Sequence, residues 1–108
     1  MFQAPDFEMD LTPDPTRIRI SRHGLTPEMF SQLLQRQGGR CAICRSQDPG
    51  GSSWCVDHDH KHCPGQYGCA SCVRGLLCNP CNTMLAQAKD NPHTLEVGAM
   101  YLKASKQW

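Results

Sequence analysis

Four ionisable residues, Asp57-His58-Asp59-His60, stand side by side in the middle of the chain. Such a run is costly to bury and adds little to a core, so a metal-binding or catalytic use is its natural explanation. In a strand the two aspartates point to one face and the two histidines to the other. A turn directly after the strand would bring Asp57 and His58 to one pocket edge. A solvated polar loop and a zinc site built from these side chains are the alternatives.

Eight cysteines offer a second kind of chemistry. Six of them form three Cys-x-x-Cys pairs, which are Cys41/Cys44, Cys69/Cys72 and Cys78/Cys81. Two intervening residues let one turn aim both sulfurs at a single ion, and two such pairs complete the tetrahedral set that zinc requires. The gap is 33 residues from Cys44 to Cys78 and 24 from Cys44 to Cys69, so spacing alone does not choose the partners.

The remaining two cysteines have different surroundings. Cys63 lies beside His62 and close to the pair Cys69 and Cys72, so these four residues predict a second zinc site of the Cys₃His type. The alternative is that Cys63 or His62 is only an exposed loop residue. Cys55 lies in an apolar stretch and is predicted to be a small buried hydrophobic residue.

Composition limits the fold to one small domain that needs stabilisation beyond its hydrophobic core. The 108 residues are 39% hydrophobic and include seven Phe, Tyr or Trp, so burial alone gives a marginal core. We find no apolar run long enough to cross a bilayer, and the acidic N-terminus does not resemble a signal peptide. We therefore expect a cytoplasmic protein with no membrane partner, in which reduced cysteines bind metal rather than form disulfides.

Charge is distributed unevenly along the chain. Residues 1–16 carry a net charge of −4, and residues 17–108 carry eleven bases and six acids, a net charge of +5. The second part favours contact with a polyanion, although only weakly.

The elements that must position these residues are predicted as follows. Residues 1–23 form an extended or flexible arm, whose segment Arg17–Gly24 reads as a short strand or extended stretch. The domain spans residues 24–108. Its first helix has Thr26 as N-cap and Pro27 at the first helical position, buries a face of Met29, Phe30, Leu33 and Leu34, and stops at Gly38-Gly39. Strands are predicted at Ser52–Val56 and Val73–Leu77, and further helices at Asn82–Lys89 and His93–Lys106.

Taken together, GLTPEMFSQLLQRQGGRCAIC, VDHDH and VRGLLCNPCN resemble the phage recombination endonuclease VII family of HNH nucleases. The resemblance covers about Gly24 to Asn82. It implies an α+β fold with a ββα-metal (His-Me finger) core, stabilised by zinc and flanked by N- and C-terminal helices. It also implies which cysteines hold the structural zinc, namely Cys41, Cys44, Cys78 and Cys81.

The resemblance also implies roles for the polar residues. Asp57 and Asn82 match ligands of a catalytic Mg²⁺ or Mn²⁺, and their hard oxygen donors suit those ions. His58 matches the general base, and its ordinary pKa near 6.5 suits proton transfer from water. His60 matches a histidine near the scissile phosphate. Arg74 and Lys61 flank this region and either hold phosphate or are solvated surface charges.

The resulting hypothesis is a metal-dependent endonuclease that hydrolyses phosphodiester bonds in DNA. Larger relatives of the family grip branched DNA with a long helical extension after the C-terminal helix, and this sequence ends soon after that predicted helix. Nicking or double-strand cutting is therefore expected ahead of cleavage of branched DNA. The chain is expected to be a monomer or a homodimer, with one or two structural zinc ions. A non-catalytic zinc module that contacts nucleic acid or protein is the main alternative, and a thiol oxidoreductase is the third.

Overall fold

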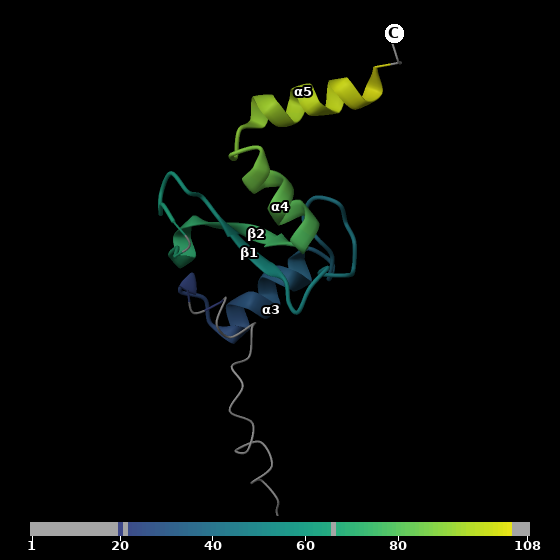
Figure 1. Ribbon diagram of the computed structural model, residues 1–108. Helices are drawn as coiled ribbons and strands as arrows, with labels where there is room; N and C mark the ends of the chain where they lie inside the picture. The colour runs from purple at the N-terminus through teal and green to yellow at the C-terminus, as the bar shows by residue number, and fades with distance from the viewer. Residues whose placement is uncertain (1–19, 21, 66, 105–108) are drawn as a thin grey trace, which may run out of the picture.

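The computed structural model describes residues 20, 22–65 and 67–104. Within these ranges the fold is α+β, with three α-helices, a short 3-10 helix and one two-stranded antiparallel sheet (Figure 1). None of the described helices has the length and apolar character needed to span a bilayer.

The sheet is a hairpin of β1 (Cys55–His58) and β2 (Val73–Leu77). β2 has the predicted bounds. β1 starts three residues later than the predicted Ser52–Val56 and includes Asp57 and His58, which were expected to follow the strand. The register shifts between these two residues: Asp57 lies opposite Gly75 and His58 opposite Val73, which leaves Arg74 as an extra residue of β2. Such an irregularity re-aims neighbouring side chains and explains how both polar residues fit within the strand.

Helix α3 (Pro27–Arg36) confirms the prediction made from its cap. The Thr26 hydroxyl accepts a hydrogen bond from the Met29 backbone N–H at 3.1 Å. The helix ends before Gly38 and Gly39, whose φ angles of 71° and 72° favour glycine. Met29 is an exception to the predicted buried face, because 38% of it is exposed. The side chains that do pack against the core are Phe30, Leu33 and Leu34.

A single side chain ties the end of α3 to β2. The Gln37 amide donates to the Leu76 carbonyl at 2.9 Å and accepts from the Leu76 N–H at 2.9 Å. It thereby satisfies the backbone groups of Leu76 at the outer edge of β2, which has no further strand beside it in the described residues. Leu76 itself is fully buried, with Trp54, Val56 and Leu77 around it in the core.

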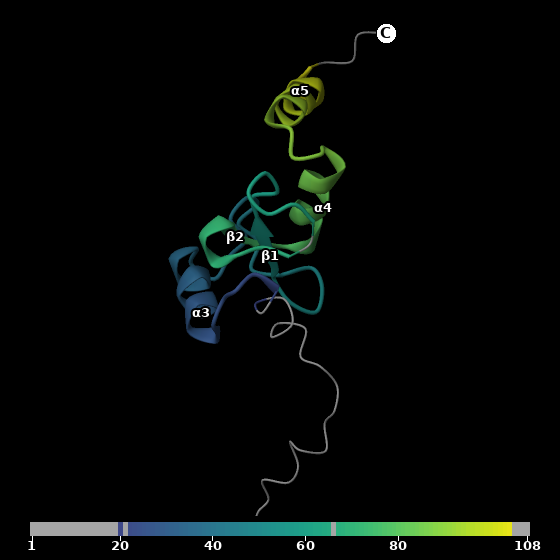
Figure 2. The same ribbon diagram turned by 90° about the vertical axis from the view of Figure 1, so that its left-hand side faces the viewer.

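The last two helices differ in how they pack. α4 (Asn79–Gln87) lies against the hairpin and begins earlier than the predicted Asn82–Lys89, because Pro80 is tolerated in a first helical turn. Asn82 is therefore inside α4 rather than at its start. α5 (Pro92–Lys103) was predicted at His93–Lys106 and projects away from the hairpin in both views (Figures 1 and 2). Its residues are exposed except Leu95, which is half-buried.

The N-terminal segment differs from the prediction where it can be described. Residues 1–19 and 21 of the expected arm lie outside the described residues, as does most of the expected strand Arg17–Gly24. Ile20 and Arg22 lie in a helical turn rather than a strand. Ile20 and His23 are buried, because this turn packs onto the core and onto the loop between the strands.

Candidate metal and active site

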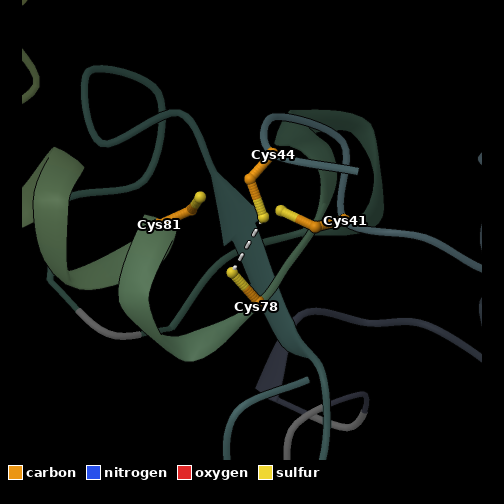
Figure 3. Close-up of side chains that lie close together, drawn as sticks. All are labelled: Cys41, Cys44, Cys78 and Cys81. Carbon is orange, nitrogen blue, oxygen red and sulfur yellow. Dashed lines mark hydrogen bonds between the residues drawn. The ribbon is translucent and has the colours of Figure 1, made fainter. Parts of the chain in front are cut away.

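Cys41, Cys44, Cys78 and Cys81 gather beside the hairpin and are called the first cluster (Figure 3). The turn after α3 supplies Cys41 and Cys44, Cys78 is the residue before α4, and Cys81 lies on its first turn. The four sulfurs lie within 4.8 Å of one another, and those of Cys44 and Cys78 are 3.6 Å apart. Thiolates bound to one tetrahedral zinc are about 3.8 Å apart, so this cluster could hold a zinc ion.

The electrostatics of the first cluster also suit a dication. Burial raises the pKa of Cys41, but backbone N–H groups at Cys78, Cys44 and Ile43 more than offset this and bring its pKa down to about 6. Burial and the neighbouring thiols raise the pKa of Cys81 to about 12. The thiols therefore resist ionising together unless a positive charge lies among them.

Asp57 is buried and paired with Arg74. The guanidinium donates from Nε to Asp57 Oδ2 at 2.7 Å and from Nη2 to Oδ1 at 3.0 Å. Arg74 also lies 3.6 Å from Asp90 Oδ2. The hydrogen bonds to Asp57 raise the pKa of Arg74. Of the two cations expected near phosphate, Arg74 is thus committed to Asp57, and Lys61 is exposed on the loop.

His58 is buried, with 3% of the residue exposed, and both of its ring nitrogens have partners. Nε2 lies 3.0 Å from the Cys63 carbonyl and 3.1 Å from the Gly65 carbonyl. Carbonyls only accept, so Nε2 carries the proton in the neutral ring and Nδ1 is the acceptor. His23 Nε2 lies 3.0 Å from this Nδ1 and is therefore assigned as its donor.

His60 lies next to His58 and contacts a carboxylate from the other end of the domain. Its Nδ1 is 2.7 Å from Asp90 Oδ2, and its ring centroid is 4.3 Å from that of His58. Asp90 follows α4 and has a φ angle of 55°. The contact with Asp90 holds the His60 ring in one orientation beside His58.

A cleft of about 390 Å³ brings the predicted polar residues together. Asp57, His60 and Asn82 line it, along with Lys89 and Asp90 from the turn after α4. The same three residues also line a second hollow of about 170 Å³, whose wall includes His58 and His23. β1, the turn after it and α4 thus bring to adjoining walls all four residues that the resemblance assigned to catalysis.

A known protein family matches most of the chain, including both cysteine clusters and the cleft. Residues 16–104 match the family of recombination endonuclease VII. The chain belongs to the recombination endonuclease VII family. It is 37% identical over 89 residues to the Gene 59 protein of Mycobacterium phage D29, and 40% identical over 67 residues to the Gene 59 protein of Mycobacterium phage L5. The alignments cover 82% and 62% of this chain but 48% and 35% of those proteins, so the chain spans about half of their length or less.

A second cluster of this endonuclease VII family member consists of His62, Cys63, Cys69 and Cys72. Its ligand atoms also lie within 4.8 Å of one another, and it could hold a zinc ion as well. A hydrogen bond with the Ser71 hydroxyl lowers the pKa of Cys69 to about 6. Hydrogen bonding with Cys72 raises the pKa of Cys63 to about 11. As predicted, Cys55 is buried and belongs to neither cluster.

Sequence reasoning missed two residues of the endonuclease VII region. His23 precedes α3 and carried no signal beyond its position in an Arg-rich segment. Asp90 lies just beyond the predicted helix Asn82–Lys89 and carried no signal of a role, whereas its side chain contacts His60. Both depend on contacts across 30 or more positions of the chain, which local patterns do not reveal.

Proposed function

We propose that this endonuclease VII family member is an HNH-type (His-Me finger) DNA endonuclease that nicks or cuts by metal-dependent hydrolysis. The ββα-metal core would consist of β1, β2 and α4. One observation carries the proposal: Asp57, His58 and Asn82 line adjoining hollows of a strand–strand–helix unit. The first cluster would hold a structural zinc, and the second cluster a second zinc.

The residues in the cleft suit a hard divalent cation such as Mg²⁺ or Mn²⁺. Asp57 offers a carboxylate and Asn82 an amide oxygen, and such oxygen donors are those that Mg²⁺ prefers. The buried Asp57 carboxylate needs a positive partner, a role that Arg74 fills at present and that a bound cation would share. When bound, the cation would stabilise negative charge on the phosphoryl group and on the departing 3′ oxygen.

His58 would accept a proton from the attacking water. Its Nε2–H is engaged by the two loop carbonyls, so Nδ1 is the nitrogen that can act as the base. Because His23 donates to Nδ1 in the structure, the water must take the place of this contact. His60, supported by Asp90, would hold the scissile phosphate, with Lys89 on the wall of the same cleft.

Cleavage of supercoiled plasmid with Mg²⁺ or Mn²⁺, with EDTA as the control, tests the proposal. His58→Ala should slow cleavage by about 10²–10⁴-fold, the usual contribution of a general base, while zinc content and the circular dichroism spectrum stay unchanged. His93→Ala is the matched control, because His93 is exposed at the start of α5. Cleavage by His58→Ala at the wild-type rate would refute the assignment. A wild-type protein that binds DNA without cutting it would instead be a binding module.

A further inference from the structure

We infer that the second cluster is a zinc-held clamp that positions His58. The kinetic part of this inference rests on the proposed nuclease function, whereas the structural part does not. The cluster lies within the loop that joins β1 to β2, so its ligands begin four residues after His58 and end at the residue before β2. This placement couples a metal site directly to the proposed base.

The distances within the second cluster are those of a tetrahedral zinc site. Sulfurs bound to one zinc are about 3.8 Å apart, and a bound imidazole nitrogen lies about 3.6 Å from each sulfur. The sulfurs of Cys63 and Cys69 are 3.7 Å apart. His62 Nδ1 lies 3.3 Å from the Cys63 sulfur and 3.5 Å from the Cys69 sulfur. These values are close to that of the first cluster, in which the sulfurs of Cys44 and Cys78 lie 3.6 Å apart.

The chain around these ligands holds the His58 ring. The carbonyl of Cys63, itself a cluster residue, accepts from His58 Nε2, and the Gly65 carbonyl does so from the same loop. At the other end of the loop, the Asp59 N–H donates to the Cys72 carbonyl at 2.8 Å. Fixing Cys63 on the ion therefore fixes one of the acceptors that set the His58 tautomer, and fixing Cys72 holds the backbone of Asp59, the residue after His58. Metal sites and catalytic groups commonly depend on such outer contacts for their orientation.

Gly68 shows how closely the clamp and the histidines pack. A Cβ atom at this position would lie 3.0 Å from His58 Cγ, 3.0 Å from His23 Cδ2 and 3.2 Å from the Cys72 sulfur. All three distances are tighter than ordinary van der Waals contact, so any side chain there displaces the ring or the ligand. The Gly68 N–H also donates to the Arg22 carbonyl at 3.0 Å, which holds the loop against the N-terminal turn.

Burial alone does not hold this loop in place. His62, Pro64, Gly65 and Tyr67 are exposed, and Cys72 is the buried member of the cluster. A segment with so little buried apolar surface opens readily unless it is cross-linked, and a metal ion supplies such a cross-link. Loss of the ion would leave His58 in its strand but release the carbonyls that orient its ring.

Cys69→Ser and Gly68→Ala, with Cys55→Ala as the matched control, test the clamp. Elemental analysis should give two zinc ions per chain for the wild type, Cys55→Ala and Gly68→Ala, and one for Cys69→Ser. Both test variants should lose about 10- to 100-fold in the rate of single-turnover cleavage, the usual cost of removing an outer-shell partner, with DNA affinity little changed. The NMR signal of the His58 Nε2 proton should broaden or vanish in both.

The outcomes separate the clamp from the nuclease assignment. One zinc per wild-type chain would overturn the second site. Unchanged cleavage and an unchanged His58 signal in Cys69→Ser, with one zinc retained, would overturn the clamp. A wild-type protein that cuts no DNA would refute the proposed function, while zinc content and the His58 signal still decide the clamp. If Cys69→Ser fails to fold, the wild type stripped of the ion of the second cluster by a chelator decides, because an unchanged His58 signal would then overturn the clamp.

Discussion

The two cysteine clusters differ in burial and in the part of the chain that they join. In the first cluster three of the four cysteines are buried, and its two pairs lie on either side of the hairpin in the sequence. In the second cluster only Cys72 is buried, and all four ligands lie in one loop. The first cluster therefore holds α3, the hairpin and α4 together, whereas the second braces one loop beside His58. Similar ligand geometry can thus serve the whole fold in one place and a single side chain in another.

The largest difference is expected from serine substitutions in the two clusters. Cys81→Ser removes a buried ligand of the first cluster, and structural zinc contributes about 10–16 kcal/mol in small zinc domains, against a total stability of about 5–15 kcal/mol. We expect Cys81→Ser to lose its cooperative thermal transition and the ion of the first cluster, whereas Cys69→Ser keeps its transition and that ion. Circular dichroism and elemental analysis measure this. A cooperatively folded Cys81→Ser would contradict the division of roles.

The two clusters should lose their zinc ions at different rates when a chelator is added. The second cluster is more exposed, so a chromogenic chelator should take its ion first, with little change in the circular dichroism spectrum. The ion of the first cluster should leave in a slower phase that coincides with unfolding. Release of both ions in one phase, together with unfolding, would show that the clusters act as a single unit.

A smaller effect is expected from Arg74→Gln, which alters the cleft at Asp57 rather than either cluster. Asp57 would lose its charged partner, but Arg74 is 43% exposed, so the loss is about 1 kcal/mol and lowers the melting temperature by about 4–8 °C. Because Mg²⁺ would then be the main partner of Asp57, its addition should raise the melting temperature more in the variant than in the wild type. Both zinc ions should remain. Equal stabilisation of the two proteins by Mg²⁺ would argue against Asp57 as a ligand.

Local signals predicted part of the fold well. The bounds of β2 and the start of α3 follow from a short apolar run and from the Thr26-Pro27 cap, both of which act within a few residues. The extent of β1 could not be predicted in this way. Asp57 stays in the strand because Arg74, an extra residue in the opposite strand, neutralises it, and that pairing exists only in the folded hairpin.

The candidate site, like the fold, was predicted only where local patterns in the sequence were sufficient. The cysteine spacing predicted metal binding, and the resemblance selected the first cluster, whose four residues the structure brings together. The assignment of Asp57, His58 and Asn82 to catalysis stays a prediction. His23 could not have been found from the sequence, because its contact with His58 depends on a close approach of two segments that Gly68 permits.

The placement of the second cluster within a single loop also affects how the domain assembles. Its first and last ligands, His62 and Cys72, are ten positions apart, whereas a ligand contact of the first cluster joins residues 34 positions apart. Closing the shorter segment costs about 1 kcal/mol less conformational entropy. The short loop can therefore capture its ion while the rest of the chain is still unfolded, and the hairpin turn is then formed before the strands on either side of it have paired.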